Sequence, residues 1–129
     1  MTKVLIVEDN EKNLKLFKII IESLGYETLL ARDGEEGIKK AKEQIPNLIL
    51  MDIQMPVMDG VSAKKVLLAD ERTKDIPVIA LTSYAMKGNK ERLIEAGFID
   101  YISKPISKES FIEAVEKALR KSHVRDQKT

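Results

Sequence analysis

The clearest sign of the fold is the stretch Leu48-Ile49-Leu50-Met51-Asp52, in which four consecutive apolar residues are followed by a carboxylate. A short run that is apolar at every position is typical of a strand buried on both faces of a sheet. Comparable short runs recur along the chain. The strands that they predict are Val4–Val7, Thr28–Leu30, Leu48–Met51, Val78–Leu81 and Tyr101–Ile102.

The segments between these runs carry apolar residues at the three- and four-residue spacing of helices. The residues that mark these helices are Leu14, Phe17, Ile21 and Leu24, then Ile38, Ala41 and Ile45, then Val66 and Leu67, then Leu93 and Ile94, and finally Phe111, Val115, Ala118 and Leu119. Strand and helix therefore alternate five times along the chain. This alternation predicts an α/β fold in which a parallel sheet is covered by helices on both faces.

Turn residues stand where these helices should begin and end. Gly25 and Gly97 each follow a helical segment at the position of a C-terminal cap, and Ser107 is placed to cap the last helix. The segment Ala85–Ala96 is the weakest helix, because Gly88 lies near its start and glycine costs about 1 kcal/mol relative to alanine inside a helix. This segment is either a helix that begins late or an element that can shift at low cost.

Composition limits the kinds of protein that the chain can be. Its 129 residues suffice for one domain, expected over residues 1–122, with a flexible tail over 123–129. The absence of cysteine excludes disulfides, thiolate catalysis and zinc–thiolate sites. With 22 basic and 21 acidic residues, the net charge of +1 offers no basic field for nucleic acid. No apolar run is long enough for a signal peptide or a membrane span, so we expect a cytoplasmic protein.

Polar residues follow the expected strands at the edge where open parallel sheets bind ligands. The residues at these strand ends are Glu8, Asp9, Asp52, Thr82 and Lys104. Each of them, standing alone, could be a helix cap or a turn residue. Three carboxylates at one edge repel one another and raise one another's pKa values, however, and nothing in folding requires them to cluster. Mg²⁺, which takes a few carboxylates and keeps several waters, would relieve this repulsion together with Lys104.

Asp52 is the candidate nucleophile of this site. A carboxylate of ordinary pKa is already ionised at neutral pH and needs no general base. Its natural electrophile is a phosphoryl group, whose charge Mg²⁺ and Lys104 would neutralise. Other phosphate chemistry fits less well, because the chain has no P-loop and carries Gln54 where an aspartate-dependent phosphatase would need a second carboxylate. The lone histidine, His123, lies in the expected tail.

Four motifs resemble the receiver domain of response regulators in two-component signalling. They are Val4–Asn10, Leu50–Gly60, Ala80–Ser83 and Tyr101–Pro105, and the resemblance covers nearly the whole chain. Within this family the motifs are most similar to DivK-type single-domain regulators and to the receivers of hybrid histidine kinases. The resemblance implies a flavodoxin-like, five-stranded parallel sheet with strand order 2-1-3-4-5 and five helices on its two faces.

The resemblance also implies a role for each matching residue. Asp52 would accept a phosphoryl group from a histidine kinase or a histidine phosphotransfer protein. Asp9, Asp52 and the backbone carbonyl of Gln54 would bind Mg²⁺, and Glu8 would act mainly through water. Lys104, which a cis proline follows, would pair with the acceptor and then with the phosphoryl oxygens.

Two residues would carry the change to a partner surface. The resemblance implies that Thr82 turns to bond a phosphoryl oxygen and that Tyr101 follows it inward. The surface that changes would be formed by the helix expected over residues 85–96, the strand at Tyr101 and the last helix. A downstream protein would bind there.

A second surface is a candidate for docking the phosphodonor. Leu16 and Ile19 fall away from the core-facing side of the expected first helix. Scattered exposed apolar residues are ordinary, so both could equally lack a function. The hypothesis is that these two residues, with Asn13 and Pro105, contact the partner near Asp52.

Four functions remain open from the sequence. The leading one is a signalling protein, not an enzyme, whose binding surface is controlled by phosphorylation. The others are a phosphorelay intermediate, a Mg²⁺-dependent phosphohydrolase and a receiver cut from a hybrid kinase. The start Met1-Thr2-Lys3, directly before the first strand, favours a natural N-terminus over the last of these.

Overall fold

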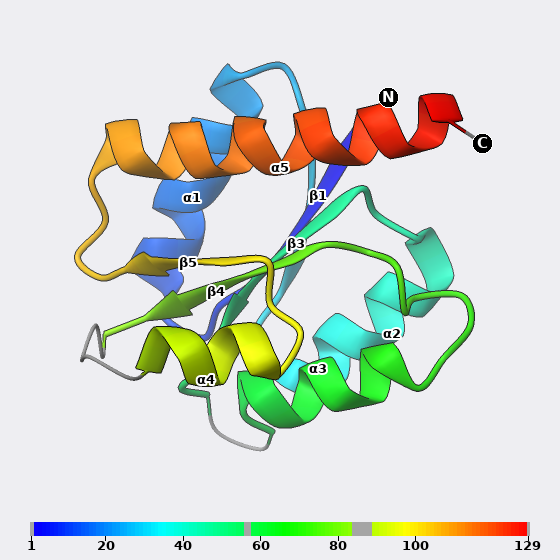
Figure 1. The fold of residues 1–129 in the computed structure, drawn as a ribbon. Coiled ribbons are helices and arrows are strands. Elements are labelled where there is room, and N and C mark those ends of the chain that lie inside the picture. The colour runs from blue at the N-terminus through cyan, green and yellow to red at the C-terminus, as the bar shows by residue number, and fades with distance from the viewer. Residues whose placement is uncertain (1, 56–57, 84–88, 129) are drawn as a thin grey trace.

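Strands and helices alternate along the whole chain in the computed structural model, which describes residues 2–55, 58–83 and 89–128 (Figure 1). The elements in chain order are β1 (Lys3–Val7), α1 (Glu11–Ser23), β2 (Glu27–Ala31), α2 (Gly34–Gln44), β3 (Leu48–Asp52), α3 (Gly60–Leu68), β4 (Val78–Thr82), α4 (Asn89–Glu95), β5 (Asp100–Ser103) and α5 (Lys108–Lys128). Each strand predicted from an apolar run is present in its place and is longer by one or two residues.

The five strands form one parallel sheet in the order β2-β1-β3-β4-β5, as the resemblance implied. β1 pairs with both β2 and β3, so the two strands that carry the acidic motifs lie side by side inside the sheet. Every residue of β3 and β4 is buried, because helices cover both faces of the sheet. Since all strands are parallel, their carboxyl ends meet at one edge.

Alternate residues of the interior strands face two separate layers of helices. In β1, Ile6 belongs to the apolar cluster of α1 and α5, whereas Leu5 and Val7 belong to the cluster of α2, α3 and α4. Figure 1 shows these two layers on opposite sides of the sheet. Between α1 and α5, the rings of Phe17 and Phe111 stack with their centroids 5.2 Å apart. The prediction of helices on both faces is therefore confirmed.

The helices begin and end at the turn residues expected from the sequence, and the end of α2 adds a residue of a different kind. Gly25 and Gly97 have φ angles of 91° and 103°, the left-handed conformation expected after a helix. Ser107 Oγ accepts a hydrogen bond of 3.4 Å from a backbone N–H three residues later, at the start of α5. Ile45, whose spacing from Ile38 and Ala41 marked this helix in the sequence, is its C-terminal cap: it has a φ angle of 45° and is 45% exposed. Pro46 follows it, and the residue before proline is disfavoured in the helical conformation.

Two expectations concern segments at the limits of the described residues. The structure describes α4 from Asn89 onward, and residues 85–88 of the weak helical segment lie outside the described residues. The helix α5 continues to Lys128, through most of the predicted tail, and a domain boundary at residue 122 stays a prediction. Within the described ranges, no helix combines the length and the apolar character needed to cross a membrane.

Candidate functional site

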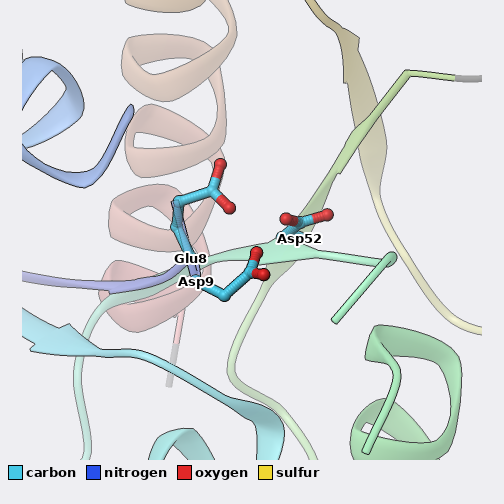
Figure 2. A group of neighbouring side chains, drawn as sticks. All are labelled: Glu8, Asp9 and Asp52. Carbon is cyan, nitrogen blue, oxygen red and sulfur yellow. The ribbon is translucent and has the colours of Figure 1, made fainter. Parts of the chain in front are cut away.

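Three carboxylates meet at the carboxyl edge of the sheet, where β1 and β3 end. They belong to Glu8, Asp9 and Asp52, and each offers an oxygen within 4.8 Å of the others. Figure 2 shows the three side chains extending from these strand ends toward the same region. Glu8 and Asp52 are buried and Asp9 is exposed, so this acidic cluster opens to solvent on one side.

The first turn of α1 supports the acidic cluster. Asn10 is the N-cap, and its side chain accepts a hydrogen bond of 3.0 Å from the Asn13 N–H. The cap is therefore Asn10, which leaves Asp9 in the cluster. The side chain of Asn13 donates to Glu8 Oε1 at 3.2 Å. Sequence reasoning placed Asn13 on a partner surface and missed this contact, although its spacing of five residues from Glu8 across a helix start is compatible with it.

Lys104 joins two of the three carboxylates. Its Nζ lies 2.6 Å from Glu8 Oε1 and 3.1 Å from Asp52 Oδ2. Its peptide bond to Pro105 is cis, as the resemblance implied. Its backbone N–H donates to the carbonyl of Thr82 at 2.7 Å, which continues the pairing of β5 with β4. The structure thus brings Glu8, Asp52 and Lys104 into direct contact.

The other oxygen of Asp52 is held by the loop that follows β3. The Gln54 N–H donates to Asp52 Oδ1 at 2.9 Å. The Gln54 side chain in turn accepts a long hydrogen bond of 3.4 Å from the Ser83 N–H, just after β4. One oxygen of Asp52 therefore faces a backbone N–H and the other faces an ammonium group, which fixes the rotation of the carboxylate.

The two buried carboxyl groups have pKa values shifted in opposite directions. Burial and the hydrogen bond with Asp52 raise the pKa of Glu8 to about 7. Burial also acts to raise the pKa of Asp52, but hydrogen bonds from Glu8, the Gln54 N–H and Lys104 outweigh it and lower that pKa below its usual value. Against the effect of burial, hydrogen bonds to Glu8 and Asp52 raise the pKa of Lys104. Asp52 is therefore ionised at neutral pH, as a nucleophile requires.

The donor set of the acidic cluster suits a hard divalent cation. Three carboxylates and one ammonium carry a formal charge of −2 when all are ionised, which a divalent ion would balance. Oxygens on opposite sides of Mg²⁺ are about 4.2 Å apart, because each Mg–O bond is about 2.1 Å long. The observed spread of up to 4.8 Å needs only small side-chain rotations to match. All of these donors are oxygens, the ligands that Mg²⁺ prefers.

Thr82 and Tyr101 lie on neighbouring strands at different distances from the carboxyl edge of the sheet. Thr82 is the last residue of β4, is fully buried and pairs with Ser103. Tyr101 pairs with Ala80, two residues further from the acidic edge, and is half-buried. Its ring centroid lies 5.8 Å from Lys90 Nζ of α4. The structure therefore places Thr82 at the acidic edge and Tyr101 on the surface that α4, β5 and α5 share.

An open pocket of about 540 Å³ lies on this α4–β5–α5 surface. Its lining includes Lys90, Lys117, Asp100, Tyr101 and Pro105. Both signs of charge are present, so the surface suits a partner with polar groups. Sequence reasoning grouped Pro105 with the phosphodonor surface, whereas the structure also makes it part of this pocket.

Leu16 and Ile19 are exposed on α1, as the helical spacing predicts, with 45% and 66% of their surface accessible. The buried side of the same helix carries Leu14 and Phe17. Because α1 begins three residues after Glu8, its first turns border the acidic cluster. Two large apolar side chains are thus accessible on the helix that leads away from the site.

Comparison with known proteins connects this geometry to a family. The family model of the response regulator receiver domain matches residues 4–116. The chain is 52% identical over 120 residues to the polar-differentiation response regulator DivK of Brucella ovis, a match that covers 92% of this chain and 98% of that protein.

Solved structures agree with the sequence relatives. The receiver domain of a sensor histidine kinase from Pseudomonas aeruginosa is 35% identical, with a TM-score of 0.84 over 92% of this chain and 97% of that one, and it holds a magnesium ion in its active-site cleft. Chemotaxis protein CheY4 of Vibrio cholerae is 28% identical, with a TM-score of 0.86 over 92% of this chain and 99% of that one.

The residues matched by the family model include the acidic cluster, Lys104 and all five strands except Lys3, the first residue of β1. Sheet order, strand-end chemistry and sequence similarity therefore lead to the same conclusion. The chain belongs to the family of response regulator receiver domains, the signalling modules of two-component systems.

Proposed function

We propose that Asp52 is the phosphoacceptor of this receiver domain and that its donor is a phosphohistidine on a histidine kinase or a histidine phosphotransfer protein. The observation that carries the proposal is the contact of 3.1 Å between Lys104 Nζ and Asp52 Oδ2, beside the carboxylates of Glu8 and Asp9. This arrangement combines a nucleophile, a cation for the transferred group and a set of oxygen ligands for a metal.

In the proposed transfer, an oxygen of Asp52 attacks the phosphorus atom of the donor. The P–N bond to the imidazole breaks as the O–P bond forms, and the electron pair of the broken bond returns to the imidazole nitrogen. Because the pKa of Asp52 is lowered, no base has to remove a proton first. Lys104 lies next to the attacking carboxylate and offsets charge on the phosphoryl oxygens.

The proposed metal ligands are Asp9, Asp52 and the backbone carbonyl of Gln54, with Glu8 acting through water. Mg²⁺, when bound, supplies positive charge that stabilises the phosphoryl oxygens. Asn13 holds Glu8 at 3.2 Å and the Gln54 N–H holds Asp52 at 2.9 Å, so both carboxylates are oriented by their own neighbours.

Phosphorylation is proposed to act on the partner surface through Thr82 and Tyr101. Moving a two-state switch from about 1:99 to about 99:1 takes about 5.5 kcal/mol. Hydrogen bonds to charged groups contribute about 1.5–3 kcal/mol each, so two or three new bonds suffice. Their proposed donors are Thr82, Lys104 and the Ser83 N–H, which makes a long hydrogen bond of 3.4 Å to Gln54. Tyr101 would then reshape the pocket on the α4–β5–α5 surface, where a downstream protein binds.

The same site would also serve a phosphorelay that passes the group to a second histidine protein. A transfer assay from the purified phosphorylated protein to candidate histidine phosphotransfer proteins separates a relay from a switch.

A cytoplasmic location of the protein stays a prediction.

A small phosphodonor such as acetyl phosphate is expected to phosphorylate the protein without a kinase, because nucleophile, cation and metal ligands all belong to this chain. Intact-mass spectrometry should show the gain of one phosphoryl group in the presence of Mg²⁺, and excess chelator should prevent it. An unchanged mass with Mg²⁺ and donor, in protein shown to be folded by circular dichroism, contradicts the proposed function.

The variants Leu16→Ala and Ile19→Ala are expected to slow transfer from the cognate phosphodonor about fivefold, the effect of losing about 1 kcal/mol of interface contact. Phosphorylation by acetyl phosphate should not change, because neither side chain belongs to the acidic cluster. Ile99→Ala is the matched control. Ile99 is 44% exposed and lies at the amino end of β5, whereas the acidic cluster lies at the carboxyl ends of the strands. Equal rates of transfer to all three variants and the wild type would rule out α1 as the docking surface.

A further inference from the structure

Gly34 opens α2, and its backbone lies against the loop that follows β3. A Cβ atom at Gly34 would lie 2.8 Å from the carbonyl oxygen of Met58 and 3.2 Å from its Cβ and Cγ atoms. The backbone of Gly34 does not have a positive φ angle, and alanine favours a helix over glycine by about 1 kcal/mol. What glycine provides at this buried position is therefore room for Met58.

The chain after Met58 is confined on its other side as well. Gly60 opens α3, and a Cβ atom there would lie 2.6 Å from the carbonyl oxygen of Asp52 and 2.7 Å from Ile53 Cα. The Gly60 N–H also donates to the carbonyl of Ile53 at 3.3 Å. Between Met58 and Gly60, Asp59 caps α3 by accepting a hydrogen bond of 2.8 Å from the N–H of Ser62, in the first turn of that helix. Residues 58–60 are thus held between the start of α2 and the end of β3.

The helix α2 cannot retreat from this loop at low cost. One turn after Gly34, a Cβ atom at Gly37 would lie 2.8 and 3.1 Å from the two methyl groups of Val7 in β1. Asp33 further fixes the start of the helix by accepting a hydrogen bond of 2.8 Å from the Glu36 N–H. A methyl group added at Gly34 would therefore displace Met58 and not the helix.

We infer that Gly34, which lies outside the acidic cluster, is a positioning residue for the phosphoacceptor loop. A displacement of Met58 moves Gly60, which has no room for a Cβ atom beside the carbonyl of Asp52 and whose N–H is bonded to Ile53. Gln54, in the same loop, donates its N–H to Asp52 and is the proposed source of a metal-binding carbonyl. The effect on metal and phosphoryl binding rests on the proposed function, whereas the effect on the loop itself does not.

The test compares Gly34→Ala with Gly37→Ala, the same substitution one turn later on the same helix but against Val7. In the metal-free protein, Gly34→Ala should shift the backbone amide NMR signals of Asp52 and Gln54. Calorimetric titration should show a Kd for Mg²⁺ about tenfold higher, the effect expected when groups that orient metal ligands are disturbed. Gly37→Ala presses on Val7 and not on Met58, so it should lower the melting temperature but leave the Gln54 signal close to that of the wild type.

The outcomes separate this inference from the proposed function. Wild-type amide signals and Mg²⁺ affinity in Gly34→Ala would overturn the inference, even if Asp52 is phosphorylated normally. Failure of the unmodified protein to take up a phosphoryl group would instead overturn the proposed function. If Gly34→Ala does not fold, Met58→Ala tests the contact from the loop side. It should shift the Gln54 signal and weaken Mg²⁺ binding, and unchanged values would overturn the inference.

Discussion

The Asp52→Asn variant is expected to take up no phosphoryl group, either from acetyl phosphate with Mg²⁺ or from a cognate histidine kinase. Asparagine matches aspartate in shape, but its amide is not an ionised nucleophile and cannot form an acyl phosphate. The fold should persist, because an amide oxygen can still accept the Gln54 N–H that lies 2.9 Å from Asp52 Oδ1. Intact-mass spectrometry measures the uptake, and circular dichroism checks the fold.

Asp59→Asn is the matched control for this experiment. Asp59 is an exposed aspartate in the same loop region, and it caps α3 by accepting the Ser62 N–H at 2.8 Å. Asparagine caps helices about as well as aspartate, so this variant should be phosphorylated at the wild-type rate. Uptake of one phosphoryl group by Asp52→Asn would show that the acceptor lies elsewhere in the chain.

Lys104→Met is expected to have two effects of opposite sign. The Mg²⁺ affinity should rise about tenfold, because the variant lacks a cation that repels a divalent ion bound by the same carboxylates. The rate of phosphorylation by acetyl phosphate should fall about a hundredfold, because nothing replaces the ammonium group that offsets phosphoryl charge. Calorimetry and initial rates from mass spectrometry measure the two effects, at a pH above the Glu8 pKa of about 7.

Lys64→Met controls for the loss of a buried lysine. Lys64 is 2% exposed, burial lowers its pKa, and it lies on α3 against Gly97 and not at the acidic edge. This variant should keep wild-type Mg²⁺ affinity and phosphorylation rate. If Lys104→Met lost Mg²⁺ binding and phosphorylation together, the lysine would be needed to hold the carboxylates in place, and the proposed division of roles would be wrong.

Most of the fold is predictable because burial leaves a direct mark on the sequence. A strand such as β3 is covered by helices on both faces, so every position must be apolar until Asp52 ends it. The edge strand β2 is only partly buried. Its apolar run therefore predicts that a strand is present but not where the strand begins and ends. Ile45 continues the helical spacing of α2, but the helical conformation is disfavoured before Pro46, and the helix ends there with Ile45 as its cap.

The acidic site is predictable to the extent that it depends on strand ends. Parallel strands bring Glu8, Asp52 and Lys104 to one edge whatever the loops do. Contacts between separate elements produce no comparable pattern in the amino-acid sequence. The hydrogen bond from Asn13 depends on how α1 leaves β1, and the role of Gly34 depends on where the loop from β3 passes α2. Neither distance can be read from residue type or spacing.

The position of Lys104 has a consequence for engineering. Its side chain contacts residues at the ends of β1 and β3, and its backbone N–H is bonded to Thr82 at the end of β4. A single residue after β5 thus meets the ends of three other strands, outside the apolar layers on either face of the sheet. A change of charge at Asp52 can therefore reach the connection between β5 and α5 without repacking the interior. Changes within the apolar layers, away from Gly34, should then alter thermal stability. Changes at the strand-end residues and the surface beside them should alter signalling specificity.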